Sequence, residues 1–177
     1  MGIVLFDTSV LLLAIHPNAR PPLDPATGLM LEYAQQRVNY LIQKLSKAKV
    51  KVIIPTPALS ELLVHAGPAA NDYVQSLQQS PFRIVPFNTR AAAECADAVR
   101  QFGLRGKGKE NPRAKIKFDR QIVAIAKTEG VETIYSDDVD IYKYGRQADI
   151  AVIRSYEIEL DPATKQRNLD LDTPSAM

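Results

Sequence analysis

The stretch Ile3-Val4-Leu5-Phe6-Asp7-Thr8-Ser9 determines how this chain is expected to fold. Its four consecutive apolar residues, with no polar alternation, are typical of a strand buried on both faces, as in a parallel sheet. The run ends at Asp7, and residues 10–15 then have the composition of a short helix. Ligands of open parallel sheets bind beyond the carboxyl ends of the strands. The segment therefore predicts a parallel sheet with an acidic residue at the edge where ligands bind.

The rest of the chain alternates short apolar runs with helical patterns. Further strands are expected at 52–54, 82–85, 133–135 and 150–153, and helices at 29–47, from 56 onward, and at 69–79, 88–102 and 118–127. Strands that alternate with helices indicate an α/β fold with a central, mostly parallel sheet flanked by helices on both faces. We expect the proline-rich segment 16–28 and the glycine-rich segment 103–114 to be loops.

Composition excludes several classes of protein. Of 177 residues, 46% are hydrophobic and 24% charged, which argues against disorder, collagen and a coiled coil. The single Cys95 cannot form an internal disulfide and fits a reducing cytosol. No apolar run approaches the roughly 20 residues of a membrane span, and the N-terminal apolar run is too short for a signal peptide. We therefore expect a soluble, cytoplasmic protein that does not bind a membrane.

Acidic residues from four parts of the chain are predicted to converge on the carboxyl edge of the sheet. Asp7 and the segment 137–140 follow strands, whereas Glu61 and Asp119 lie near the starts of helices. Two like charges about 4 Å apart repel by roughly 4 kcal/mol at an effective dielectric constant of 20. A cluster is tolerable if some carboxyls are protonated or if a hard cation binds between them. Each acid taken alone has another explanation: Asp119 could cap a helix, Glu61 could be a solvated helix position, and 137–140 could be turn residues. The hypothesis of an acidic site therefore depends on the combination.

Four segments of the chain resemble, in order, the four motifs of PIN-domain proteins, a family that includes the VapC-type toxins. They are Ile3-Val4-Leu5-Phe6-Asp7-Thr8-Ser9-Val10, Pro55-Thr56-Pro57-Ala58-Leu59-Ser60-Glu61-Leu62, Phe118-Asp119-Arg120-Gln121-Ile122-Val123-Ala124-Ile125-Ala126 and Tyr135-Ser136-Asp137-Asp138-Val139-Asp140-Ile141. The resemblance implies a single PIN-like domain over residues 2–155, followed by a polar C-terminal tail at 156–177.

The resemblance also implies an activity, hydrolysis of RNA phosphodiesters by a nuclease that uses Mg²⁺ or Mn²⁺. By motif position, the catalytic and metal-binding carboxylates would be Asp7, Glu61, Asp119 and Asp138, with Asp140 as an accessory metal ligand. Asp137 occupies the variable position of the fourth motif and is expected to face away. Side chains that would support these ligands or the substrate are Thr8, Ser9 and Ser136.

A locally basic stretch leads into Asp119. The chain has 22 basic and 20 acidic residues, yet seven of the basic ones lie between residues 103 and 120. We expect RNA phosphates to contact Lys107, Lys109, Arg113, Lys115 and Lys117. The alternative is a solvated loop that its glycines keep flexible. His16 and His65 are isolated in the sequence and are expected to be surface or packing residues.

Two other functions remain compatible with the sequence. A phosphatase with Asp7 as a covalent nucleophile would need an acid two residues later, where Ser9 stands. A catalytically silent PIN-like module would bind RNA or a protein without cutting, although all four carboxylate positions are filled. For a toxin, the family resemblance further implies a cognate antitoxin protein and a homodimer.

Overall fold

The computed structural model describes residues 2–103 and 113–164, with the side chains of 113–116 left out. Its centre is a five-stranded sheet in the order β3-β2-β1-β4-β5. The strands are β1 (Ile3–Phe6), β2 (Lys51–Pro55), β3 (Arg83–Val85), β4 (Thr133–Tyr135) and β5 (Ala151–Ile153). Every neighbouring pair is parallel, which confirms the predicted α/β fold with a parallel sheet. The predicted first strand forms the middle of the sheet.

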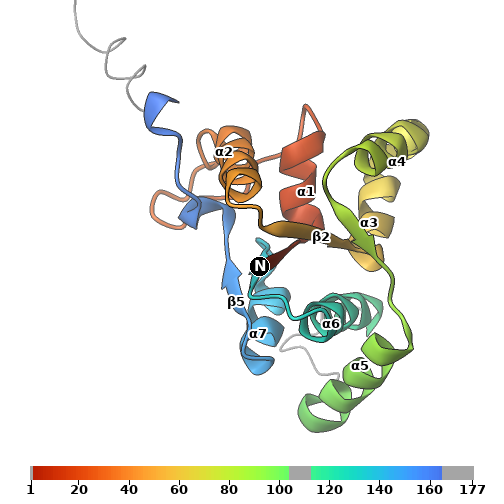
Figure 1. Cartoon of the computed structure of the whole chain (residues 1–177). Helices are drawn as coiled ribbons and strands as arrows, with labels where there is room; N and C mark the ends of the chain where they lie inside the picture. Colours follow the sequence, from red (N-terminus) through yellow and green to blue (C-terminus); the bar gives the residue numbers. More distant parts are fainter. Residues whose placement is uncertain (1, 104–112, 165–177) are drawn as a thin grey trace, which may run out of the picture.

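Helices cover both faces of this sheet, as expected. They are α1 (Thr8–Ile15), α2 (Ala34–Lys47), α3 (Thr56–Ala66), α4 (Ala70–Gln79), α5 (Thr89–Phe102), α6 (Arg113–Thr128) and α7 (Val139–Gln147), with short 3₁₀ turns at Gly67–Ala69 and Ser155–Glu157. Figure 1 shows α1 to α4 on one face and α5 to α7 on the other. Because the faces of the sheet are covered, ligands are expected at the ends of the strands.

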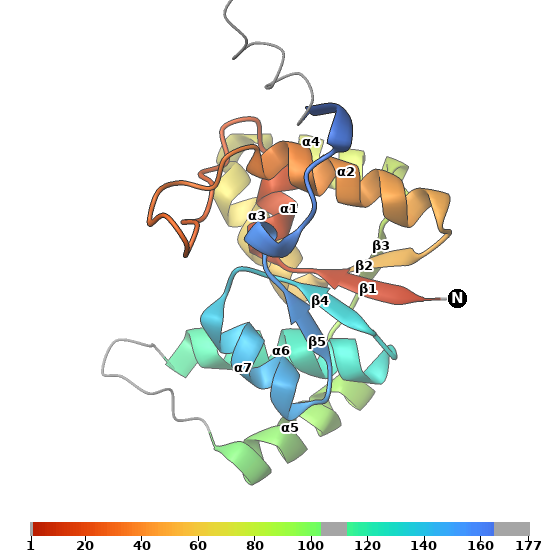
Figure 2. The ribbon, with the colours of Figure 1, turned by 90° about the vertical axis from the view of Figure 1, so that its left-hand side faces the viewer.

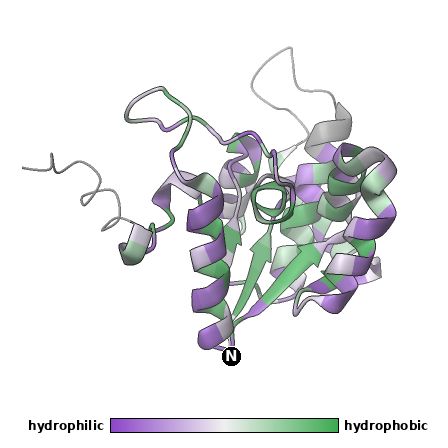
Figure 3. Ribbon diagram, turned by 90° about the horizontal axis from the view of Figure 1, so that it is seen from above, coloured by the Kyte–Doolittle hydropathy of each residue, from purple (hydrophilic) through white to green (hydrophobic). Residues whose placement is uncertain are grey.

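The core lies on both sides of the central strands. Leu5, Phe6 and Ile53 are fully buried, and the strands are mainly hydrophobic (Figure 3). The Phe6 ring packs edge-on against Tyr135, with 5.5 Å between ring centroids. Side chains this tightly enclosed hold the ends of β1 and β4 in a fixed relation, because protein interiors are packed as densely as organic crystals. The residues that follow these two strands, Asp7 and Ser136, are therefore placed rigidly.

The main differences from the sequence predictions concern three helices. Helix α2 begins at Ala34 instead of residue 29, because backbone hydrogen bonds from Leu31 to Pro22 and from Asp24 to Leu29 close 22–31 into a loop. Helix α6 begins at Arg113, so the end of the predicted basic loop is helical. Helix α7 was not predicted at all.

The described start of the C-terminal tail packs against the domain. Ile158 and Leu160 are buried, and Arg37 of α2 donates from Nη1 to the Ile158 carbonyl oxygen at 2.6 Å. Lys44 and Glu159 form an exposed ion pair nearby. The domain boundary at residue 155 stays a prediction. Within 2–103 and 113–164, the helices are too short or too polar to cross a bilayer.

Candidate active site

Asp7 is held at the end of β1 by its neighbours on β4. Its backbone N–H donates to the Tyr135 carbonyl oxygen at 3.1 Å, continuing the β1–β4 pairing by one residue. Its side chain is only 4% exposed, and Oδ2 accepts a 2.8 Å hydrogen bond from the Ser136 hydroxyl and a longer one, 3.4 Å, from Ser9. Two donors on one oxygen fix the orientation of the carboxylate.

The environment makes ionisation of Asp7 costly. Burial raises the pKa of its carboxyl from 3.8 to about 6. Hydrogen bonds from Ser136 and from the Thr8 backbone oppose this rise, whereas the nearby charges of Glu61 and Asp138 add to it. A buried carboxylate beside other carboxylates is the environment in which a bound cation relieves the most repulsion.

Two hydroxyl groups connect Asp7 to the other predicted acids. Ser136 is fully buried; its Oγ donates to Asp7 and accepts from the Asp138 backbone N–H at 3.1 Å. The Thr8 hydroxyl donates to Glu61 Oε2 at 2.6 Å and so joins the start of α1 to α3. Because these bonds orient the carboxylates without neutralising them, the supporting roles predicted for Thr8, Ser9 and Ser136 fit the geometry.

Three further carboxylates form a group with the spacing of metal ligands. Asp119 from α6, with Asp138 and Asp140 at the start of α7, each offer one oxygen, and these oxygens all lie within 4.8 Å of one another. Asp138 is the N-cap of α7, where its Oδ1 accepts from the backbone N–H of Asp140 at 2.7 Å. Asp119 is 4% exposed and the other two are half-buried. Oxygen donors at this spacing suit Mg²⁺ or Mn²⁺.

The structure thus brings the five predicted acids to one edge of the sheet in two adjoining parts. Asp7 and Glu61 form one part, and Asp119, Asp138 and Asp140 form the other, with Ser136 between them. Asp137 is turned aside, because its carboxylate accepts from the Ser155 backbone N–H at 2.8 Å and from the Ser155 hydroxyl at 2.6 Å.

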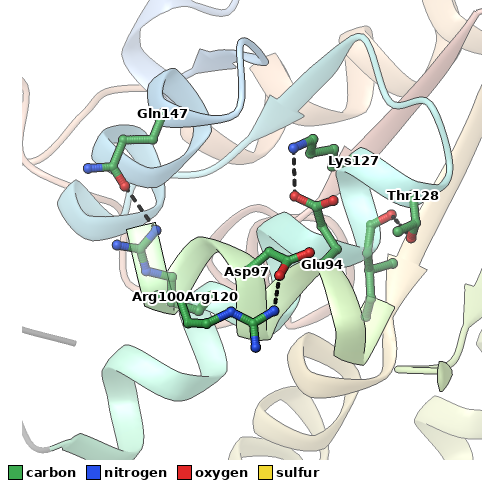
Figure 4. Close-up of polar contacts among 8 residues, drawn as sticks. Glu94, Asp97, Arg100, Arg120, Lys127, Thr128 and Gln147 are labelled. Atoms are coloured by element: carbon green, nitrogen blue, oxygen red, sulfur yellow. Dashed lines mark hydrogen bonds and ion pairs between the residues drawn. The ribbon is translucent and has the colours of Figure 1, made fainter. Parts of the chain in front are cut away.

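Arg120, directly after Asp119, has a structural role that its place in the basic stretch did not suggest. Its guanidinium lies 3.9 Å from the centroid of the Tyr144 ring, and the side chain is only 4% exposed. Nη1 donates to Gln147 Oε1 at 2.9 Å (Figure 4), and Nη2 to the Gly103 carbonyl oxygen at 3.3 Å. Burial lowers the pKa of Arg120. One side chain therefore joins the end of α5 to α6 and α7, the helices that carry three of the acids.

The predicted RNA-binding residues are only partly within the described structure. Lys117 is exposed on α6, two residues before Asp119. Arg113 and Lys115 belong to the same helix, but their side chains lie outside the described residues, as do Lys107 and Lys109. The predicted contacts with RNA stay a prediction.

A cavity that was not predicted from the sequence lies beside the acids. It holds about 350 Å³ and opens between α1, the following loop and α3, where its lining includes Ser9, His16, His65 and Asp137. The two histidines are 49 positions apart and are brought together only by the fold. The sequence showed only that His16 directly follows the first helix and that His65 lies one helical turn after Glu61, which does not indicate that the two line one cavity.

Comparisons with known proteins agree with this architecture. A model of the PIN domain family matches residues 4–147. Among solved structures, VapBC2 from Rickettsia felis bound to a promoter DNA fragment superposes with a TM-score of 0.55 at 16% identity, covering 86% of this chain and 98% of that one. DNA-bound VapBC from Salmonella typhimurium gives 0.53 at 13% identity, covering 88% and 99%.

A third solved structure is Mycobacterium tuberculosis VapC20, a toxin that cleaves the sarcin-ricin loop. It has a TM-score of 0.50 at 14% identity and covers 80% of this chain and 95% of that one. No curated protein sequence matches the chain. At such low identities the structural neighbours show a shared fold, whereas the family model spans most of the chain and covers all four acidic motifs. This chain therefore belongs to the PIN domain family.

Proposed function

We propose that the chain is a metal-dependent endoribonuclease, the toxin of a toxin–antitoxin pair, that hydrolyses RNA phosphodiesters. The observation that carries the proposal is the convergence of Asp7, Glu61, Asp119, Asp138 and Asp140 on the open edge of the sheet. Holding several carboxylates close together lowers stability through charge repulsion, and a structural role would be served as well by neutral side chains. A catalytic cation explains why the acids are present.

The donor set fits Mg²⁺ or Mn²⁺, and Asp119, Asp138 and Asp140 would hold the ion. When bound, such an ion lowers the pKa of a coordinated water and stabilises the leaving oxygen of a phosphodiester. Asp7 is buried beside these acids in a fixed orientation, and we assign to it the role of taking the proton of the attacking water. Ser136 keeps its carboxylate in one orientation.

Toxin identity is supported by two kinds of similarity. The PIN family model matches the chain, and the solved structures that share its fold include VapBC complexes and a toxin that cleaves RNA. By analogy with these proteins, we propose that the chain binds a cognate antitoxin protein and forms a homodimer. Ser9 donates a hydrogen bond to Asp7 where a phosphatase of the covalent type would have its acid, so the geometry favours the nuclease.

Cleavage of a mixed RNA pool tests the proposal. The wild type and Asp7→Asn are incubated with RNA in Mg²⁺, in Mn²⁺ and in EDTA, with Asp97→Asn as the matched control because Asp97 lies exposed on α5. We expect cleavage only with metal, a loss of at least 100-fold in Asp7→Asn, and full activity in the control. Unchanged cleavage in Asp7→Asn contradicts the mechanism. RNA binding without cleavage under any condition supports the silent module instead.

A further inference from the structure

We propose that the 350 Å³ cavity beside the acids is a subsite for one nucleotide of the RNA, the nucleotide adjoining the scissile phosphodiester. This inference rests on the proposed nuclease function. The cavity would select the nucleotide that lies next to the cleaved bond. It concerns α1, the start of the loop after it and the end of α3, none of which carries the three-carboxylate group.

The cavity is continuous with the catalytic edge. Ser9 and Asp137 form the wall on that side, and the Asp137 backbone N–H donates to Ser9 Oγ at 3.0 Å. Ser9 in turn donates to Asp7 Oδ2 at 3.4 Å. Only one side chain therefore separates the cavity from Asp7. Since neighbouring units of an RNA strand are a few ångströms apart, a phosphodiester at the acids places the next nucleoside at this opening.

The size and the floor of the cavity suit a nucleobase. A volume of about 350 Å³ lies at the lower end of the range for small-molecule pockets. Leu12, Leu13, Ala19 and Pro22 supply apolar surface, against which the flat face of a base packs without regard to sequence. Hydrogen-bonding groups around such a floor then discriminate between bases.

Those groups are His16, Asn18, Arg20 and His65, which also line the cavity. Arg20 is exposed and contributes a permanent positive charge. His16 Nδ1 accepts a 3.1 Å hydrogen bond from the Asn18 backbone, so the neutral ring carries its proton on Nε2 and offers a donor there. The one acid in the lining, Asp137, has its carboxylate bonded to Ser155. Asp137 keeps its charge, but both of its oxygens are occupied by Ser155, so the groups left to bind a ligand include the Arg20 cation and the His16 donor. These groups suit a nucleotide better than a basic protein segment.

The cavity is formed before any ligand binds. The Gln35 side chain of α2 donates to the His16 carbonyl oxygen at 2.9 Å, and the His16 ring lies edge-on to Tyr73 of α4, with 6.3 Å between centroids. These contacts tie the start of the loop to two helices. In Figure 2 the loop 16–33 projects from the side of the molecule opposite the label N, which marks the start of β1. An RNA strand that reaches the strand ends meets this loop.

The histidines give a direct experiment, because the only two in the chain both line the cavity. Their imidazole C–H signals in NMR spectra therefore report on the cavity alone. The full-length Asp7→Asn protein, in EDTA, is titrated with the four 5′-nucleoside monophosphates, with RNA trinucleotides and with inorganic phosphate. We expect saturable shifts of both histidine signals, different for different bases, and a weaker response to phosphate alone.

Two variants and a control make the test specific. Ala19→Phe fills the cavity and Arg20→Ala removes its charge, and each is expected to weaken trinucleotide binding about tenfold. Arg90→Ala, an exposed arginine at the start of α5, is expected to bind as the parent does. Retained amide spectra in each variant show that the fold is intact. In the otherwise wild-type chain, Ala19→Phe is expected to change which nucleotide flanks the cut.

The failure of this inference is distinguishable from failure of the nuclease. If the wild type cuts RNA but no nucleotide moves the histidine signals, the subsite is wrong and the nuclease stands. Undiminished trinucleotide binding by folded Ala19→Phe also overturns the subsite. Histidine shifts produced by a protein partner but by no nucleotide assign the cavity to that partner instead.

Discussion

Replacing Asp7 by asparagine is expected to stabilise the metal-free protein while abolishing its cleavage of RNA. The side chain is buried, and its pKa is about 6 compared with 3.8 for an ordinary aspartate. The folded state therefore binds the proton more tightly than the unfolded state does. Ionised Asp7 opposes folding, and this penalty is absent well below pH 3.8, grows between pH 3.8 and 6, and is complete above pH 6.

The size of the effect follows from the shift in pKa. A difference of about two units, at roughly 1.4 kcal/mol per unit, gives a penalty of about 3 kcal/mol at pH 7.5 and about 1 kcal/mol at pH 4.5. Asparagine keeps the shape and an acceptor for Ser136 but has no charge. For a chain of this length, about 3 kcal/mol corresponds to an increase in Tm of roughly 6–12 °C.

Urea unfolding in EDTA at the two pH values measures the difference directly. Asp97→Asn, on the surface of α5, is the control and is expected to leave the free energy of unfolding unchanged at both pH values. Addition of Mg²⁺ at pH 7.5 is expected to stabilise the wild type more than Asp7→Asn. If Asp7→Asn is stabilised equally at pH 4.5 and 7.5, or is destabilised at pH 7.5, the buried charge of Asp7 is not what lowers the stability of the wild type.

Three further perturbations have expected outcomes. Ser136→Ala removes the hydrogen bond to Asp7 and is expected to lower the free energy of unfolding by about 1–3 kcal/mol, measured by urea unfolding. It is also expected to raise the pKa of Asp7 further. An unchanged stability would contradict the bridging role of Ser136. Arg120→Met removes the contact with the Tyr144 ring and two hydrogen bonds, and about 2 kcal/mol of destabilisation, measured likewise, is expected. Lys117→Gln is expected to weaken RNA binding modestly and to reduce the slope of log affinity against log salt by about 0.7 in a salt titration, and an unaltered slope would exclude a phosphate contact.

The sheet could be predicted from the sequence because its strands are continuous apolar runs, but α7 could not. Its residues Val139–Gln147 include Gly145, which disfavours a helix by about 1 kcal/mol relative to alanine. The structure supplies the reason for the glycine, since a Cβ at this position would collide with the Val152 side chain of β5. Close packing between α7 and the sheet, a tertiary effect, thus outweighs the local preference.

The candidate site was predictable to the extent that it depends on where strands end. Asp7 directly follows β1 and reaches the edge where parallel strands end, beside Ser136 of the fourth motif. Asp119 also lies beside that motif, but for another reason than its expected place near a helix start: it is well inside α6 (Arg113–Thr128), and α6 follows α5 and not a strand. The cavity of His16 and His65 depends instead on how α1 packs against α3, and periodicity in a single sequence carries no information about that packing. Arg120 escaped prediction for the same reason, because its partners lie on α5 and α7.

The segment Ser136-Asp137-Asp138 shows how one acidic run divides into two roles. Side chains alternate in direction along an extended chain, so the first and third members face the same side and the second faces the other. Ser136 accordingly bonds to Asp7, and Asp138 lies beside Asp119 and Asp140. Asp137 instead accepts from Ser155 and so links the end of β4 to the segment that follows β5. Asp137→Asn would keep an acceptor for only one of the two Ser155 donors. It is therefore expected to loosen the wall of the cavity while leaving the carboxylates of Asp119, Asp138 and Asp140 in place.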